Sequence, residues 1–282
     1  AYDAEGRKVY ESYPYSATDI GVTVQYDALG RVTRRINPDA TEVRYTYEPG
    51  AVSMQDEKGR TTRQEWDAFG SPDDKRLKAV VDAAASRWTY SYNTLGALTR
   101  VDAPGGLIRE WQYQHSGRPA LLSAEVHPES GTTSYTHYDE AGRLRRKVDA
   151  KGTVFTYEYD TNGRPERITA GDRVTTYRYE AGTDNRASAS VDGVTTSWGY
   201  DAAGRLTSRI DVISGEPQMA QAFEYDSRDN LIRVNYASGG RVQFDYNAAN
   251  QVSQVTDVSD PAAPAVFANQ FEYHPSGALT SY

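Results

Sequence analysis

Aspartate and glycine recur along this chain in one spacing, Asp-x-x-Gly, and the recurrence decides what chemistry these residues can do. Examples are Asp27 to Gly30, Asp139 to Gly142 and Asp201 to Gly204. An aspartate at this position accepts hydrogen bonds from the backbone two residues on, and glycine tolerates a positive φ. A catalytic carboxylate would occur once or as one pair, whereas this aspartate occurs at many turns. The pattern therefore indicates structural turns.

Metal binding is the next chemistry to weigh, because carboxylates and histidines are both present. An EF-hand loop needs Asp-x-Asp-x-Asp-Gly and a later Glu, and a calcium-binding β-helix needs a nine-residue period. Neither pattern occurs, and the chain has no Cys for thiolate sites or disulfides. The histidines are scattered, and we expect surface or turn roles for His115, His127, His137 and His274. The sequence thus predicts no metal site and no cofactor.

Nucleophilic and phosphate-binding motifs are also missing. The chain contains no Gly-x-Ser-x-Gly elbow and no Gly-x-x-x-x-Gly-Lys-Ser/Thr loop. Asp73 and Asp74 stand beside Lys75 and Arg76, which we interpret as a solvated charge cluster. A hydrolase hidden in the repeats has only the abundance of carboxylates in its favour. We therefore expect no catalytic residues and no enzymatic activity in this segment.

Composition indicates what kind of fold must position these turns. Leu, Ile, Val and Phe make up 46 of 282 residues, or 16%, a fraction low enough to raise the question of disorder. The net charge is only −8, however, and the 22 Tyr and 4 Trp are residues that disordered chains lack. Tyrosine fits a half-buried pleated surface. The composition favours a Tyr-rich β structure over a Leu-rich helical bundle.

Charge and hydropathy exclude further classes. Acidic residues outnumber basic ones by 39 to 31, which argues against a nucleic-acid groove. The longest apolar runs are a few residues, so no transmembrane helix is expected. Of the basic residues, 25 are Arg and 6 are Lys. The planar fork of donors on arginine can hold turns and neighbouring strands together.

One signature recurs along the whole chain. It is clearest in Tyr26 to Val32 (YDALGRV), Tyr138 to Leu144 (YDEAGRL) and Tyr200 to Leu206 (YDAAGRL). The spacings between 13 such starts run from 19 to 27 residues, with a base period near 21. In two copies Asp229 and Asn250 replace the glycine, and both residues tolerate left-handed geometry. The weaker copies start at Tyr2, Tyr47, Trp66, Tyr92, Tyr113, Tyr159, Tyr179, Tyr225, Tyr246 and Tyr273.

Each repeat is predicted to hold two strands and two turns. Another aromatic stands two positions before the start in 9 of 12 repeats, so both rings share one face of a strand. Second turns are expected at Asp149–Gly152, Ala237–Gly240 and Pro104–Gly106. Thirteen repeats give about 26 antiparallel strands, too many for an open flat sheet, so the sheet must curl. A β-propeller with two repeats per blade is the main rival.

Two segments depart from the repeat pattern. Residues 72–87 (PDDKRLKAVVDAAASR) are the one helix candidate, as a single helix or an ordered excursion. Residues 257–267 contain Pro261 and Pro264, and we expect a surface loop there. The rest of residues 1–282 is expected to be a single array of about 13 repeats, truncated at both ends.

The Tyr-Asp-x-x-Gly-Arg-Leu signature with its period near 21 resembles the YD repeat of Rhs proteins, which also occurs in the C component of insecticidal Tc toxins and in teneurins. The resemblance covers essentially the whole chain. It implies an all-β fold in which antiparallel hairpin repeats form a curled spiral sheet, part of a hollow shell. In bacterial members the shell encapsulates a toxic C-terminal domain, and delivery by a type VI secretion system is common.

The chain also departs from the family pattern. The element that closes the shell ends in an Asp-Pro-x-Gly-Leu type of motif, which supplies a self-cleaving aspartate. The only Asp-Pro here, Asp260-Pro261, is followed by Ala262-Ala263-Pro264, so that motif is missing. We therefore expect a segment of a longer shell protein, most simply of a bacterial Rhs polymorphic toxin.

Three functions follow for testing. The first is a non-enzymatic segment of a toxin-encapsulating cage, secreted or delivered to the cell surface without a visible signal peptide. Its partners would be the rest of the shell, the toxin domain, and a secretion spike or chaperone, with no nucleic acid. The second is a carbohydrate- or receptor-binding adhesion module, since exposed rings can stack on sugars. The third is the enzyme considered above.

Overall fold

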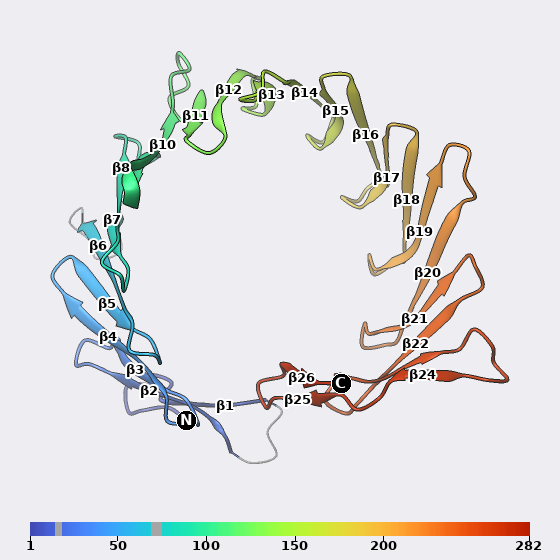
Figure 1. The fold of residues 1–282 in the computed structure, drawn as a ribbon, viewed down its shortest axis with the longest axis horizontal. Helices are drawn as coiled ribbons and strands as arrows, with labels where there is room; N and C mark the ends of the chain where they lie inside the picture. The colour runs from blue at the N-terminus through green and yellow to red at the C-terminus, as the bar shows by residue number, and fades with distance from the viewer. Residues whose placement is uncertain (15–18, 69–74) are drawn as a thin grey trace. The chain divides into compact units, whose positions relative to one another are not determined.

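The computed structural model describes residues 1–14, 19–68 and 75–282, and in this part of the chain the regular structure is almost entirely β. It contains 26 strands and one short 3-10 turn, Pro104–Gly106 (Figure 1). The prediction of about 26 strands is confirmed. The chain divides into two compact units, which we name the N-terminal unit (Ala1–Thr136 with Val148–Lys151) and the C-terminal unit (His137–Lys147 with Gly152–Tyr282).

The strands of the N-terminal unit pair antiparallel with their sequence neighbours, from β1 through β12. Short turns between consecutive strands allow only this kind of pairing. Their bounds are β1 (Tyr10–Ser12), β2 (Gly21–Tyr26), β3 (Val32–Ile36), β4 (Glu42–Glu48), β5 (Ala51–Gln55), β6 (Thr61–Ala68), β7 (Lys75–Val81), β8 (Arg87–Tyr92), β9 (Leu98–Ala103), β10 (Leu107–Gln112), β11 (Ala124–His127) and β12 (Gly131–Tyr138).

The C-terminal unit follows the same plan. Strands β14 to β24 pair in order, and β25 pairs with β26 in a separate two-stranded sheet. The bounds are β13 (Leu144–Val148), β14 (Val154–Tyr159), β15 (Pro165–Ala170), β16 (Arg173–Tyr179), β17 (Arg186–Val191), β18 (Val194–Tyr200), β19 (Leu206–Ile213), β20 (Met219–Tyr225), β21 (Leu231–Tyr236), β22 (Arg241–Tyr246), β23 (Val252–Asp257), β24 (Ala265–Ala268), β25 (Glu272–Tyr273) and β26 (Leu279–Ser281).

A β-bulge accompanies the aromatic start of most repeats. In the hairpin of β2 and β3, Gln25 pairs with Arg34 while Tyr26 pairs with Val32, so Thr33 is the extra residue. The same shift precedes Trp66, Tyr92, Tyr159, Tyr179, Tyr200, Tyr225, Tyr246 and Tyr273. Such a bulge bends the strand locally and re-aims a side chain. These nine repeats therefore present their aromatic start in the same setting.

The two faces of the sheet differ in chemistry. Directly opposed residues share a face, so Tyr45 and Met54 lie on the same face as Tyr47 and Val52. We name this the ring face, because the repeat-start aromatics and the rings two residues before them lie on it. The opposite face, which carries Glu48 and its neighbours, is named the polar face. The predicted alternation of rings and polar side chains is confirmed.

The buried core is small. Among the described residues no large side chain is fully buried, and the buried positions are mostly small residues, namely Val22, Ala51, Ala79, Val101, Val234 and Thr256. Half-buried tyrosines supply much of the remaining contact. The low content of Leu and Ile therefore matches a fold that has no thick core.

The helix candidate at residues 72–87 is wrong for the part that the structure describes. Lys75–Val81 is strand β7, which pairs with β6 and β8, and a turn follows it. Ala79 stands opposite Glu65 and Thr89 and is completely buried, so alternation across the sheet outweighs the helix-favouring composition. Residues 72–74 lie outside the described residues.

The expected surface loop at residues 257–267 is shorter in the structure. Asp257 is the last residue of β23, and Ala265–Ala268 forms β24, which pairs with β23. The irregular connection is thus confined to residues 258–264, which contain both prolines. Proline lacks the backbone donor that a central strand needs, so the strands stop on either side of the pair.

Candidate functional site

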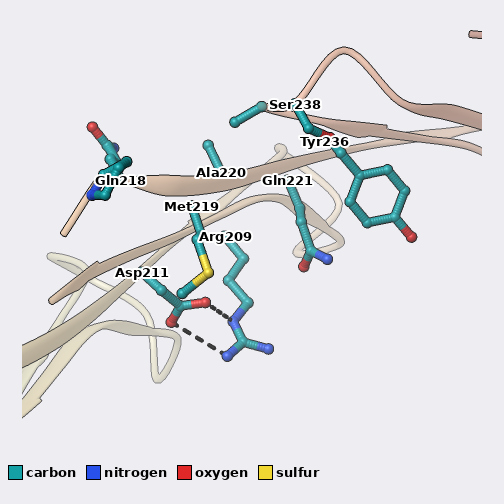
Figure 2. Close-up of a pocket in the computed structure, with 10 residues that line it drawn as sticks. Arg209, Asp211, Gln218, Met219, Ala220, Gln221, Tyr236 and Ser238 are labelled. Carbon is teal, nitrogen blue, oxygen red and sulfur yellow. Dashed lines mark hydrogen bonds and ion pairs between the residues drawn. The ribbon is translucent and has the colours of Figure 1, made fainter.

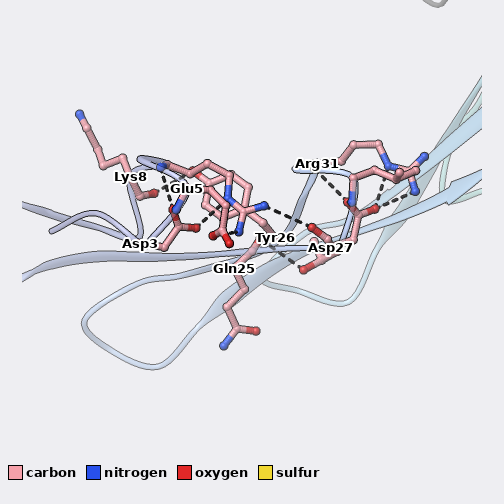
Figure 3. A network of polar contacts seen from close by, with 10 residues as sticks. Asp3, Glu5, Lys8, Gln25, Tyr26, Asp27 and Arg31 are labelled. Atoms are coloured by element: carbon pink, nitrogen blue, oxygen red, sulfur yellow. Dashed lines mark hydrogen bonds and ion pairs between the residues drawn. The ribbon is translucent and has the colours of Figure 1, made fainter.

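The repeated signature builds one turn with a fixed set of hydrogen bonds, shown for the second repeat in Figure 3. Oδ1 of Asp27 accepts from the backbone N–H groups of Leu29 and Arg31, both at 2.9 Å. Oδ2 accepts from Nε of Arg31 at 2.8 Å. Gly30 donates its N–H to the Asp27 carbonyl at 3.0 Å and has a φ of 77°, a value that residues with a Cβ rarely adopt. Asp, Gly and Arg of the signature are therefore all turn residues.

The carboxylate is electrostatically part of the turn. Hydrogen bonds from the side chain and then the backbone of Arg31 hold the pKa of Asp27 below its usual range. At Asp201 the backbone N–H of Arg205 and then its side chain have the same effect on the pKa. The same pairing of aspartate with an arginine four residues on occurs at Asp3, Asp56, Asp139 and Asp160.

In nine repeats the aromatic start joins the repeat to the one before. The hydroxyl of Tyr26 donates to the carbonyl of Lys8 at 2.7 Å, and the guanidinium of Arg7 lies 5.0 Å from the centre of the Tyr26 ring. We name this pair of contacts the repeat latch. Its hydroxyl bond recurs at Tyr47, Tyr92, Tyr159, Tyr179, Tyr200, Tyr225, Tyr246 and Tyr273.

The cation of the latch comes from the signature arginine of the preceding repeat. Arginine stacks over the next tyrosine in four further latches, with distances from guanidinium carbon to ring centre of 4.2 to 5.0 Å. The pairs are Arg31 with Tyr47, Arg143 with Tyr159, Arg164 with Tyr179, and Arg205 with Tyr225. The expectation that arginine holds turns and neighbouring strands together is confirmed by these contacts.

Near the end of the C-terminal unit the latch changes chemistry. Asn230 and Gln251 stand where earlier repeats have the signature arginine, and Nδ2 of Asn230 donates to Oδ1 of Asn250 at 2.6 Å. The left-handed position is filled by Asp229 (φ 66°) and Asn250 (φ 64°), as the sequence predicts. Amide contacts therefore replace charged ones in these repeats.

The polar face of the N-terminal unit carries ion pairs that run across several strands. Arg63 pairs with Glu48 on β4 and with Glu65, and Glu65 pairs in turn with Arg87 on β8. A second group joins Arg34 and Arg44 to Glu42, and a third joins Arg100 to Asp102 and Glu110. Exposed pairs of this kind contribute little singly, and networks contribute more. The carboxylates of these three groups all have arginine partners.

A groove of about 490 Å³ lies on the ring face of the C-terminal unit, across β19, β20 and β21 (Figure 2). Arg209 on β19 faces Gln221 on β20, which faces Tyr236 on β21. Asp211 and Met219 form the next row, and Asp211 pairs with Arg209 at 3.0 Å. No sequence motif marks this groove, so it could not be predicted from the sequence.

The histidines take different positions. His274 replaces the signature aspartate, and its Nδ1 accepts the N–H of Ser276 at 3.1 Å, which is the turn role predicted for it. His115 lies in a turn in which Arg118 donates to its carbonyl. His127 and His137 lie on β11 and β12, where His127 packs edge-on against Trp111 at 5.4 Å.

Metal-binding clusters and membrane-spanning helices are both missing from the described residues. The described residues contain no group of three or more His, Asp or Glu placed to hold a metal ion. Among the same residues, none of the helical structure is long and apolar enough to cross a membrane. The charge cluster of Asp73 and Asp74 lies outside the described residues, while Lys75 lies 4.9 Å from the centre of the Trp66 ring.

Comparison with known families places the chain. Residues 72–108, 138–175, 186–212 and 225–262 match the family described as RHS Repeat. This chain belongs to the RHS repeat family. The predicted YD-repeat resemblance is thereby confirmed, and the matched segments contain the turns at Asp139, Asp160 and Asp201.

Relatives of this RHS repeat chain include toxins. It is 26% identical, over 95% of its length, to double-stranded DNA deaminase toxin A of Burkholderia cenocepacia (strain H111), and covers 18% of that protein. It is 29% identical, over 80% of its length, to the probable deoxyribonuclease RhsB of Dickeya dadantii (strain 3937), and covers 17% of it. The chain thus spans less than a fifth of the length of these relatives.

The fold of the RHS repeat chain is shared with a solved structure. It superposes with a TM-score of 0.58 and 15% identity on a chain in the structure of the Photorhabdus luminescens Tc holotoxin pore, covering 93% of this chain and 18% of that one. The match confirms the predicted fold class, an all-β array of antiparallel hairpin repeats of the YD-repeat shell type.

Proposed function

We propose that this chain is a non-enzymatic wall segment of an Rhs-type cage that encapsulates a C-terminal toxin domain for delivery to a target cell. In this proposal residues 1–282 form a single repeat array whose partners are the rest of the shell and the toxin domain. A secretion spike or chaperone would engage the assembled protein. Export would use a specialised machine such as a type VI system.

The repeat latch is the observation that carries the proposal. Nine repeats in the described residues donate a tyrosine hydroxyl to the preceding repeat, so the recurring chemistry serves to join hairpins side by side. The signature aspartates are engaged by backbone N–H groups or arginine. Interactions that hold neighbouring hairpins together are what the wall of a cage requires. The relatives that are named as toxins support the proposal that a toxin domain is the cargo. The structural match to the Tc holotoxin chain supports the proposal that the repeats form the wall.

Protease protection of the cargo in the full-length protein tests the encapsulation. The domain that follows the repeats should resist trypsin in the intact protein, because a wall excludes the protease. Replacing Tyr159 and Tyr179 together by alanine should open the wall and let trypsin cut that domain. Replacing the exposed Leu29 by alanine is the matched control, since Leu29 is 77% exposed. Equal cleavage of the cargo in wild type and in the double variant would contradict encapsulation.

Activity measurements on the chain alone test the absence of catalysis. The purified chain should show no turnover of DNA, nucleotides, glycosides or peptides above a buffer blank. The full-length protein, assayed in parallel, supplies a positive control for cargo activity. Turnover by the chain itself, abolished by one substitution at a carboxylate, would overturn the non-enzymatic proposal.

A further inference from the structure

The groove across β19, β20 and β21 interrupts the pattern of the ring face. In five other repeats the residue nine positions after the aromatic start is aliphatic, and two of these, Val101 and Val234, are only 8% and 6% exposed. After Tyr200 the equivalent residue is Arg209, with 47% of its side chain exposed. The groove therefore lies beside an exposed arginine at a position that a buried valine fills in the hairpins of Val101 and Val234.

The charge inside this groove is balanced. Nε of Arg209 lies 3.0 Å from Asp211, which also accepts a hydrogen bond from Thr196. The other lining residues are uncharged, namely Pro217, Gln218, Met219, Ala220, Gln221, Tyr236, Ala237 and Ser238. A neutral groove favours a neutral occupant, because a charged one would lose its hydration without a counter-charge.

The groove also offers donors and acceptors beside apolar surface. Asp211 engages two nitrogens of Arg209, and the guanidinium has five N–H groups in all, so donors remain for an acceptor in the groove. In Figure 2 the amide of Gln221 points to the same side of the sheet as Arg209 and Met219, with the ring of Tyr236 beyond it. Met219 is 53% exposed and Tyr236 is 40% exposed.

We propose that this groove binds an extended, uncharged stretch of polypeptide that carries an aromatic or long aliphatic side chain. Arg, Met and Tyr are enriched at the centres of protein interfaces, where Lys and Glu are depleted, and the groove has this composition. Backbone carbonyls would accept from Arg209 and backbone N–H groups would donate to Gln221. The apolar side chain would lie between Met219 and Tyr236. The identity of the occupant rests on the proposed function, and we take it to be a segment of the enclosed domain.

The two methionines of the chain make the proposal directly measurable. With ¹³C-methyl methionine labelling, the spectrum contains one signal from Met219 in the groove and one from Met54 on β5. A capped, uncharged octapeptide with a central Leu-Phe should shift the Met219 signal and leave Met54 in place. The same peptide with Ser-Ser at its centre should shift neither. A Met219 signal that is unmoved by the Leu-Phe peptide at millimolar concentration would overturn the proposal.

Variants assign the binding to the groove. Tyr236→Ala should weaken the Leu-Phe peptide about tenfold, as expected for truncating an aromatic anchor, while Tyr236→Phe should retain binding. Arg35→Ala is the matched control, because Arg35 also stands nine residues after a repeat start, Tyr26, and should have no effect. Binding that survives Tyr236→Ala unchanged would place the peptide elsewhere and overturn the assignment.

Titration with glycans tests the competing hypothesis that the groove binds a sugar. Chitotriose and cellotriose should leave the Met219 signal unmoved, and a shift with either sugar but not with the Leu-Phe peptide would overturn the polypeptide assignment. These titrations use the isolated chain and the protease assay uses the full-length protein. A cargo that is protected although no peptide binds would refute the groove and leave the cage intact. A peptide that binds while the cargo is unprotected would refute the cage.

Discussion

Two turns of the C-terminal unit perform the same task with different chemistry. At Asp201 the carboxylate accepts from the N–H groups of Ala203 and Arg205, both at 2.9 Å, and it also pairs with the Arg205 side chain. At Asn247 a neutral amide oxygen accepts from Ala249 and Gln251 at 2.9 and 3.0 Å. The nearly equal distances show that the turn requires an acceptor at its first position and does not require a charge.

The charge serves a second purpose, which is to reach the next repeat. Arg205 lies 5.0 Å from the centre of the Tyr225 ring, donates to the Asp226 carbonyl at 3.2 Å, and pairs with Asp229 at 2.7 Å. Asn230, one repeat later, makes a single amide contact to Asn250 in the corresponding place. The arginine turns therefore combine turn formation with attachment, whereas Asn230 brings no charge to the next repeat.

Truncating the latch tyrosine should have the largest effect and should differ between the two kinds of latch. We expect Tyr225→Ala to lower the free energy of unfolding by about 3 kcal/mol, through lost packing, the hydroxyl bond and the stacked cation. Tyr246→Ala should cost about 1 kcal/mol less, because Asn230 supplies no cation. Urea denaturation with hydrogen exchange at the affected hairpin measures both. Equal losses in the free energy of unfolding would show that the stacked cation does not stabilise the latch.

The left-handed residue of the turn should give the next largest effect. Gly204 has a φ of 78°, and a Cβ added there meets no atom within 4 Å, so Gly204→Ala tests backbone strain alone. We expect a loss of about 1 kcal/mol in the free energy of unfolding. Asn250→Gly is the counterpart, and it should be neutral or slightly stabilising. A neutral Gly204→Ala would contradict the geometric reading of the signature glycine.

Removing only the latch hydroxyl should have a smaller effect that is the same in both latches. Tyr225 and Tyr246 donate to the carbonyls of Leu206 and Leu231, each at 2.9 Å. Each Tyr→Phe change should therefore cost about 1 kcal/mol, the usual net contribution of one hydrogen bond. Urea denaturation of the two single variants measures this. A clearly larger loss at Tyr246 would show that amide latches depend on the hydroxyl more than arginine latches do.

Lowering the pH should distinguish the aspartate turn at Asp201 from the asparagine turn at Asn247, and this is the smallest of the expected effects. The folded pKa of Asp201 lies below its ordinary value of 3.8 because the Arg205 backbone and side chain bind the carboxylate. Its contribution to stability is therefore complete above that value and is lost as pH falls through the lowered pKa. Hydrogen exchange at the Arg205 amide should accelerate in this range relative to the Gln251 amide. Asp201→Asn should abolish the pH dependence, and a Gln251 amide that responds equally would refute the assignment.

Much of this architecture is readable from the sequence, because it depends on residues close together in the chain. The turn at Asp27 to Arg31 closes within five residues, so its aspartate and glycine are recognisable from spacing alone. Asn250 is predictable in the same way, since few residues other than glycine adopt its φ. Alternation before each turn likewise identifies the ring face.

The latch and the groove depend on strand register and could not be predicted. The bond from Tyr26 to the Lys8 carbonyl requires knowing which residues of neighbouring hairpins stand opposite each other. Arg209 and Tyr236 lie in one groove only because β19, β20 and β21 pair in a particular register. The helix expectation at residues 75–81 failed for a related reason, since Ala79 is favoured there by the lack of space between Glu65 and Thr89.

The reach of the latch has a consequence for how such a chain can change. Each hydroxyl bond spans 14 to 21 residues, so in the described part of the chain these bonds join nine repeats, each to the repeat directly before it. Stability in a chain of this kind is a sum of nearest-neighbour terms, and folding can proceed from either end one hairpin at a time. Gain or loss of a whole repeat then rebuilds one junction and leaves the others untouched. Length can therefore drift over evolution in steps of about 21 residues without any redesign of the repeats that are kept.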